Sequence, residues 1–203
     1  MNQGKRKIKV KICGIRREAD VSFVNACLPD YVGFVFAESA RRVTAKEAAR
    51  LKSLLDPRIQ SVGVFVREAP ENIVALCEAG IISSVQLHGD ESEEEVAALK
   101  RRIPVPLIKA ISLSRDAVRD TVADFLLLDS ARAGSGTLFN WDLIGQIPRP
   151  FFLAGGLTPD NAAEAAGKVR PYALDVSSGV ETGGVKDLRK IQDFLEAVRP
   201  WRE

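Results

Sequence analysis

A closed barrel of eight parallel strands, each followed by a helix, is the fold that this sequence predicts. Eight short apolar runs alternate with helix-like segments along the chain, at an average spacing of about 25 residues (203 residues over eight units). Such alternation implies parallel strands with right-handed connections, and eight units favour a (β/α)8 TIM barrel over an open sheet. No G-x-G-x-x-G motif follows the first strand, which argues against a Rossmann fold. We therefore expect one domain, residues 1–203, with short loops.

The strand candidates are mainly apolar, as expected for strands covered on both faces in a barrel surrounded by helices. In chain order they are Lys7–Ile12, Tyr31–Phe36, Ser61–Val66, Ser83–Leu87, Val105–Ile111, Phe125–Leu128, Phe151–Ala154 and Tyr172–Val176.

The helix candidates begin at capping residues or show apolar residues at helical spacing. Thr44–Glu47 and Ser92–Glu95 have the capping-box form. Pro70 starts another helix, which stops near Gly80, and Thr158 precedes a first-turn proline. The remaining helices are indicated by Asp20, Val21 and Val24; by Val118 and Val122; by Trp141, Leu143 and Ile144; and by Leu188, Ile191, Leu195 and Val198.

Composition narrows the possible partners and location. The net charge is +2, so charge alone suggests neither nucleic acid nor a membrane as partner, and no apolar run reaches the roughly 18 residues of a spanning helix. Three cysteines at no metal-ligand spacing indicate a reduced, cytoplasmic setting, and a lone histidine, His88, argues against a multi-histidine metal site. We expect no metal and no cofactor, and either a monomer or a homodimer.

Residues whose side chains can take part in a reaction follow several of the predicted strands, where barrels place their active sites. Cys13 follows the first strand, Asp129 follows the sixth, and Arg41 and Arg42 lie in the loop after the second. A thiolate and a carboxylic acid facing one pocket can transfer protons in both directions, which suits an isomerisation without a cofactor. Such a pair needs shifted pKa values: burial can raise the pKa of Asp129, and a nearby positive charge can lower that of Cys13.

Two glycine-containing turns predict a phosphate site. Gly155-Gly156 follows the seventh strand, and Ser177-Ser178-Gly179 follows the eighth. Glycine lets backbone N–H groups approach a ligand closely, and such turns next to a helix N-terminus form an anion cradle. We expect the two turns to clamp one phosphate group of a small-molecule substrate.

Several of these motifs together resemble the phosphoribosylanthranilate isomerase family, from about residue 9 to residue 195. Each motif is weak alone, but the ordered set is highly specific. The motifs are Lys11-Ile12-Cys13-Gly14, Gly33-Phe34-Val35-Phe36, Ser39-Ala40-Arg41, Gln86-Leu87-His88-Gly89, Leu127-Leu128-Asp129, Phe139-Asn140-Trp141, Leu153-Ala154-Gly155-Gly156-Leu157 and Asp175-Val176-Ser177-Ser178-Gly179-Val180-Glu181.

The resemblance implies a (β/α)8 enzyme of tryptophan biosynthesis. It would convert N-(5-phosphoribosyl)anthranilate to 1-(2-carboxyphenylamino)-1-deoxyribulose 5-phosphate by an Amadori rearrangement. It assigns Cys13 as general base, Asp129 as general acid and Arg41 to the anthranilate carboxylate. The implied phosphate site consists of Gly134, Ser135, Gly136, Gly155, Gly156, Ser178 and Gly179.

The chain departs from the family pattern at four places: Arg16 for Thr, Ala133-Gly134-Ser135-Gly136 for Gly-Gly-Thr-Gly, Asn140 for Asp, and Gly183 for Pro.

Simpler interpretations remain for single residues. Cysteine is often a core residue, and we adopt this interpretation for Cys27 and Cys77. For Asp129 the simpler interpretation is that its side chain merely caps a turn. We expect His88 to be a packed, hydrogen-bonded structural residue and Arg42 a solvated charge. Two rival functions are an indole-glycerol-phosphate synthase, for which Lys109 would have to be the acid, and a silent barrel that only binds a phosphorylated ligand.

Overall fold

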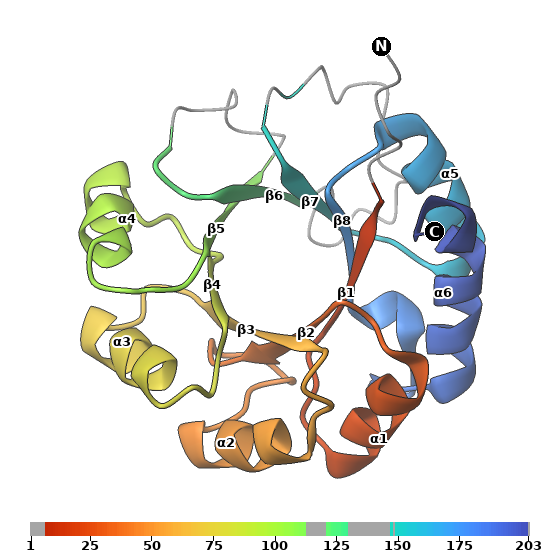
Figure 1. Cartoon of the computed structure of the whole chain (residues 1–203), viewed down its shortest axis with the longest axis horizontal. Coiled ribbons are helices and arrows are strands. Elements are labelled where there is room, and N and C mark those ends of the chain that lie inside the picture. The colour runs from red at the N-terminus through yellow and green to blue at the C-terminus, as the bar shows by residue number, and fades with distance from the viewer. Residues whose placement is uncertain (1–6, 113–120, 130–146, 148, 203) are drawn as a thin grey trace.

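The computed structural model describes residues 7–112, 121–129, 147 and 149–202. Its eight long strands are parallel and form a closed barrel in sequence order, in which β1 is hydrogen-bonded to both β2 and β8 (Figure 1). This confirms the predicted fold. The strands are β1 (Lys9–Cys13), β2 (Tyr31–Val35), β3 (Gln60–Phe65), β4 (Ser84–Leu87), β5 (Leu107–Ser112), β6 (Phe125–Asp129), β7 (Phe151–Ala154) and β8 (Ala173–Val176).

The described helices lie outside the ring of strands, and α6 lies beside α1 and α5 (Figure 1). The helices are α1 (Glu18–Cys27), α2 (Ala45–Leu54), α3 (Pro70–Glu78), α4 (Glu93–Lys100), α5 (Pro159–Val169) and α6 (Leu188–Arg202). The helix predicted around Trp141, Leu143 and Ile144 and the residue Val118 fall outside the described residues. The prediction for Val122 is wrong: it lies in a bend with its side chain 54% exposed, because the chain already turns there towards β6.

Capping boxes begin two helices where the sequence predicts them. At α2 the Thr44 Oγ1 accepts the Glu47 N–H at 3.2 Å, and the Glu47 carboxylate accepts the Thr44 N–H at 2.7 Å. Ser92 and Glu95 make the same reciprocal pair at α4. Each pair satisfies two N–H groups that the helix itself leaves without partners, so local sequence fixes where these helices start.

The strands separate two apolar layers, one outside the barrel and one inside it. The larger lies between strands and helices and includes Phe34 of β2, Ile73 of α3 and Phe194 of α6. The smaller fills the barrel interior with residues such as Tyr31, Val62, Ile108, Leu127 and Phe152. Side chains alternate along a strand, so a residue two positions after a member of this interior layer also points into the barrel. It lies nearer the carboxyl end of its strand.

A short hairpin follows β8 and returns the chain to α6. A 3-10 turn (Ser178–Val180) leads into β9 (Glu181–Thr182), which pairs antiparallel with β10 (Val185–Lys186). Gly183 and Gly184 connect them, and both have positive φ (59° and 76°), a backbone conformation that favours glycine in two-residue hairpins. The hairpin places residues 181 and 186 opposite each other.

Candidate functional site

A cavity of about 370 Å³ opens at the carboxyl ends of the strands. Cys13, Arg41 and Asp129 line it together with Gly155, Gly156 and Ser178. The structure therefore brings together most of the side chains and turns that the sequence predicts for the site. Gly134, Ser135 and Gly136 lie outside the described residues.

Cys13 ends β1, and its half-buried thiol borders the cavity. A methyl group added at Gly33 on the neighbouring strand would come within 2.7 Å of Sγ, so glycine there leaves space for the thiol. Burial raises the pKa of Cys13, and it outweighs the ammonium groups of Lys11 and Lys186, which lower it. The expectation of a lowered pKa is wrong because desolvation of the thiolate exceeds the attraction of the two lysines.

Asp129 ends β6, and two strands, β7 and β8, separate it from β1 around the barrel. His88 Nε2 lies 3.5 Å from Asp129 Oδ2. Gln86 Oε1 accepts a hydrogen bond from Lys11, so its Nε2 is the donor to His88 Nδ1, 3.0 Å away. This network assigns the His88 hydrogen to Nε2, which faces Asp129.

The expectation for His88 is half right. It is hydrogen-bonded, but its side chain is 36% exposed and lines the cavity instead of packing in the core. The reason is that β4 ends at Leu87, so residue 88 already emerges at the barrel mouth.

The two predicted turns lie against each other. A methyl group added at Gly179 would lie 1.8 Å from the Leu157 carbonyl oxygen, so the turn after β8 packs directly on the turn after β7. Gly155 and Gly156 have positive φ (93° and 65°). Among the described residues, the N–H groups of Gly156, Ser178 and Gly179 donate no backbone hydrogen bond between elements. Of these three residues, Gly156 and Ser178 line the cavity, so their N–H groups are candidate donors to an anion there.

A buried polar layer lies beneath the thiol. Lys11, two residues before Cys13 on β1, is fully buried and donates to Gln86 Oε1 at 2.6 Å and to Asp175 Oδ2 at 2.7 Å. Burial alone disfavours the ammonium, but the Asp175 carboxylate, with a smaller contribution from Cys13, raises the pKa of Lys11 above its ordinary value. Asp175 Oδ1 is buried without a hydrogen-bond partner among the described residues and belongs to a side chain that lines the cavity.

Arg41 and Arg42 have different surroundings. Arg41 lines the cavity, and its Nε and Nη2 donate to the two carboxylate oxygens of Glu181 at 2.8 and 2.7 Å. Arg42 pairs with Glu38 on the surface and is 56% exposed. Burial opposes ionisation of Glu181, but hydrogen bonds from Arg41 and Lys186 lower its pKa to about 2.

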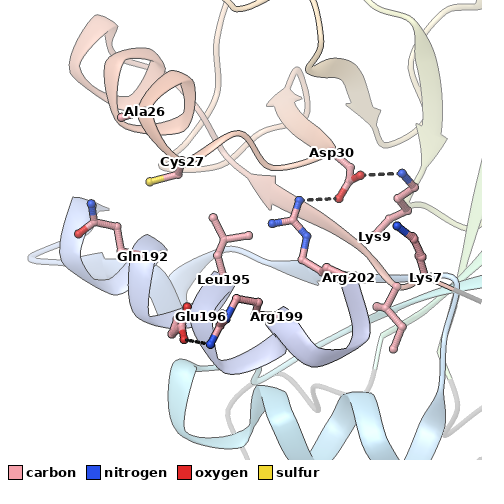
Figure 2. Close-up of a pocket in the computed structure, with 11 residues that line it drawn as sticks. Lys7, Lys9, Ala26, Cys27, Asp30, Gln192, Leu195, Glu196, Arg199 and Arg202 are labelled. Atoms are coloured by element: carbon pink, nitrogen blue, oxygen red, sulfur yellow. Dashed lines mark hydrogen bonds and ion pairs between the residues drawn. The ribbon is translucent and has the colours of Figure 1, made fainter.

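A second cavity, of about 480 Å³, lies at the other end of the barrel between α1, α6 and the start of β1. Figure 2 shows ion pairs among its charged side chains: Asp30 with Lys9 and Arg202, and Glu196 with Arg199. It is the larger of the two, but it lies away from Cys13 and Asp129. We therefore place the chemistry in the cavity at the carboxyl ends of the strands.

Comparisons with known proteins decide the family. The family model described as N-(5'-phosphoribosyl)anthranilate isomerase matches residues 10–197. The chain belongs to this isomerase family. The N-(5'-phosphoribosyl)anthranilate isomerase of Endomicrobium trichonymphae is 52% identical over 197 residues, covering 94% of this chain and 98% of that protein.

Solved structures of phosphoribosylanthranilate isomerases have the same fold. The Thermus thermophilus enzyme superposes with a TM-score of 0.83 at 36% identity, covering 95% of this chain and 99% of that one. Another, solved in complex with reduced 1-(o-carboxyphenylamino)-1-deoxyribulose 5-phosphate, has a TM-score of 0.81 at 37% identity, with coverage of 95% and 99%. By family, the chain is thus an isomerase of tryptophan biosynthesis with a TIM-barrel fold.

Several residues at this isomerase site were given no role by sequence reasoning. They are the buried polar residues around Cys13: Lys11, Gln86, Asp175, Glu181 and Lys186. One of them carried a usable signal, because Asp175 is the one charged residue in an otherwise apolar strand, where a charge needs a buried partner; Lys11 is masked by the other lysines of its strand. They pair because β1 and β8 close the barrel as neighbouring strands with Lys11 opposite Asp175, and composition does not reveal this closure.

The described residues give two further results. Every helix among them is too short or too polar to span a bilayer. Within the same ranges, no group of three or more His, Cys, Asp or Glu side chains is arranged to hold a metal ion.

Proposed function

We propose that the chain converts N-(5-phosphoribosyl)anthranilate to 1-(2-carboxyphenylamino)-1-deoxyribulose 5-phosphate as a single domain, without a cofactor, using Cys13 and Asp129. Family membership supports the reaction. The observation that carries the residue roles is that one cavity is lined by the thiol, the carboxyl group and the glycine turns. An acid and a base on one pocket are what an aldose–ketose rearrangement requires.

Asp129 would act first, as the general acid. It donates its proton to the ribose ring oxygen while the bond from that oxygen to C1 breaks. The anthranilate nitrogen lone pair forms the C1=N bond, which gives an open-chain iminium ion. His88, whose Nε2 lies 3.5 Å from Asp129 Oδ2, is placed to orient the Asp129 carboxyl group.

Cys13 would act second, as the general base. The thiolate removes the proton from C2, the C–H electrons form a C1=C2 bond, and the C=N electrons return to nitrogen. The resulting enolamine takes up a proton at C1 and releases the proton of its C2 hydroxyl, whose O–H electrons form the C2=O bond of the ketone. Because burial raises the pKa of Cys13, the thiolate needs further stabilisation, and the positive iminium ion of the substrate would supply it.

The ends of the substrate would be held by different groups. The phosphate would bind the amides around Gly155-Gly156 and Ser178-Gly179, with Gly134–Gly136 completing the site. The anthranilate carboxylate would pair with Arg41, because a guanidinium fork matches a planar carboxylate.

The position of Lys109 speaks against the rival indole-glycerol-phosphate synthase. Ile108 and Ala110 on either side belong to the interior cluster, so Lys109 points outward from β5. Its Nζ donates to Glu91 Oε2 and to the Gly89 carbonyl, both at 2.7 Å, and it does not line the cavity. A lysine on that side cannot protonate a ligand inside the barrel mouth.

The proposed reaction is tested by adding freshly generated phosphoribosylanthranilate to the pure protein and following the loss of its fluorescence. Turnover is expected. A folded protein without turnover would contradict the proposal and leave the silent-barrel alternative. Arg41→Ala should raise KM at least tenfold, whereas Arg42→Ala, a matched loss of one arginine outside the cavity, should leave KM unchanged; equal effects would remove the assignment to Arg41.

A further inference from the structure

We propose that Lys186 is a positioning residue for substrate binding: by pairing with Glu181 it leaves Arg41 with net positive charge for the carboxylate of the substrate. The proposal rests on the function proposed above and adds to it a role for the β9–β10 hairpin. Its basis is a three-residue ion cluster beside the cavity, consisting of Arg41, Glu181 and Lys186.

The geometry of the cluster fixes one side of the Arg41 guanidinium. Nε and Nη2 are held by Glu181, and Nη1 has no hydrogen-bond partner among the described residues. The arginine stem also crosses Gly14, where an added methyl group would lie 2.5 Å from Arg41 Cδ. Arg41 is therefore oriented before substrate binds, with a donor edge left over for a carboxylate.

Charge decides what that free edge can bind. Glu181 and Arg41 alone form a neutral pair, and a substrate carboxylate beside them would also approach the Glu181 carboxylate. Lys186 changes the sum of the cluster from zero to +1. Because Glu181 and Lys186 are almost completely buried, water screens these charges poorly and the extra positive charge acts on a nearby carboxylate at short range.

Burial lowers the pKa of Lys186 despite the opposing effect of the Glu181 carboxylate, and several acceptors surround its ammonium group. Its Nζ lies 2.6 Å from Glu181 Oε1, 3.0 Å from the Ser177 carbonyl oxygen and 3.5 Å from Ser177 Oγ. Three acceptors thus surround a group with three N–H donors. The Ser177 hydroxyl donates in turn to the Cys13 carbonyl at 3.1 Å, which ties Lys186 to the backbone of the proposed base.

The hairpin explains why these residues can meet. Glu181 and Lys186 are direct partners in the β9–β10 pairing, and Gly183-Gly184 supply the positive φ values that the two-residue turn needs. The turn itself lies on the surface, while the two charged side chains at its base point to the buried cluster.

The test compares ligands with and without the carboxylate. Lys186→Met removes the charge but keeps the length of the side chain. We expect it to weaken binding of the reduced product analogue, 1-(2-carboxyphenylamino)-1-deoxyribitol 5-phosphate, about tenfold or more, and to leave binding of the same compound without its carboxylate unchanged. Arg189→Met, which removes one exposed positive charge at the start of α6, should change neither dissociation constant.

A double variant separates charge from structure. Glu181→Gln/Lys186→Met returns the cluster to +1, so it should bind the carboxylate-bearing analogue more tightly than Lys186→Met alone. Equal losses for both ligands in Lys186→Met, or no recovery in the double variant, would overturn the proposal. Turnover by the unchanged protein tests the proposed function separately, so either idea can fail without the other.

Discussion

Replacing Lys11 by methionine should destabilise the barrel strongly and in a pH-dependent way. Lys11 is fully buried, and the side chain of its partner Asp175 is 6% exposed, with 2.7 Å between Nζ and Oδ2. Removing one partner of a buried ion pair costs about 3–5 kcal/mol, because the other charge stays buried without compensation. The alternative is that the carboxylate takes up a proton, which costs about 1.4 kcal/mol for each pH unit above about 4.

The free energy of unfolding, measured in urea at several pH values, checks this argument. In the unchanged protein the contribution of the pair should stay constant as the pH rises from neutral to about 9, because a raised pKa of Lys11 means that the contribution is lost only above 10.5. The Lys11→Met variant should lose stability relative to the unchanged protein as the pH rises from about 5 to about 7. Lys11→Met/Asp175→Asn, the control, should recover most of the loss. A loss below about 1 kcal/mol at neutral pH, with no slope, would refute the reasoning.

Three further predictions concern the thiol, the packed turns and a helix start. Alkylation of Cys13 by iodoacetamide, followed by peptide mass spectrometry, should accelerate with pH beyond 9.0, because burial raises the pKa of this thiol; a plateau below neutral pH would contradict this. Gly179→Ala should lower the free energy of unfolding by about 3 kcal/mol, because its methyl group meets the Leu157 carbonyl. The control Gly80→Ala, at a position with positive φ but open space, should lower it by about 1 kcal/mol. Equal losses in the two variants would exclude the packing argument. Thr44→Ala should cost about 1 kcal/mol in urea unfolding through loss of the α2 cap, and no loss would show that the cap is dispensable.

The fold was predictable because local and long-range signals agree. Apolar strands, capping residues and the eightfold alternation all indicate one barrel, and the α2 and α4 capping boxes lie where the sequence places them. Strand ends were accurate to within about two residues. The prediction for Val122 failed because helical spacing of apolar residues cannot show that the chain has already turned towards the next strand.

The candidate site was predictable in outline and not in its electrostatics. Cys13 and Asp129 follow from strand-end position and from family resemblance, and the structure places both on one cavity. The direction of the Cys13 pKa was wrong because the sequence cannot weigh burial against charges that come from distant strands. The ion cluster of Arg41, Glu181 and Lys186 likewise depends on a hairpin whose return path only the folded chain defines.

The most direct test of the account is single-turnover kinetics of Cys13→Ala and Asp129→Asn with phosphoribosylanthranilate. General acid–base catalysis contributes about 10²–10⁴-fold, so each variant should lose at least about 100-fold in rate while keeping its affinity for the reduced product analogue and its unfolding midpoint. Near-normal rates in either folded variant would contradict the assignment of that residue to proton transfer.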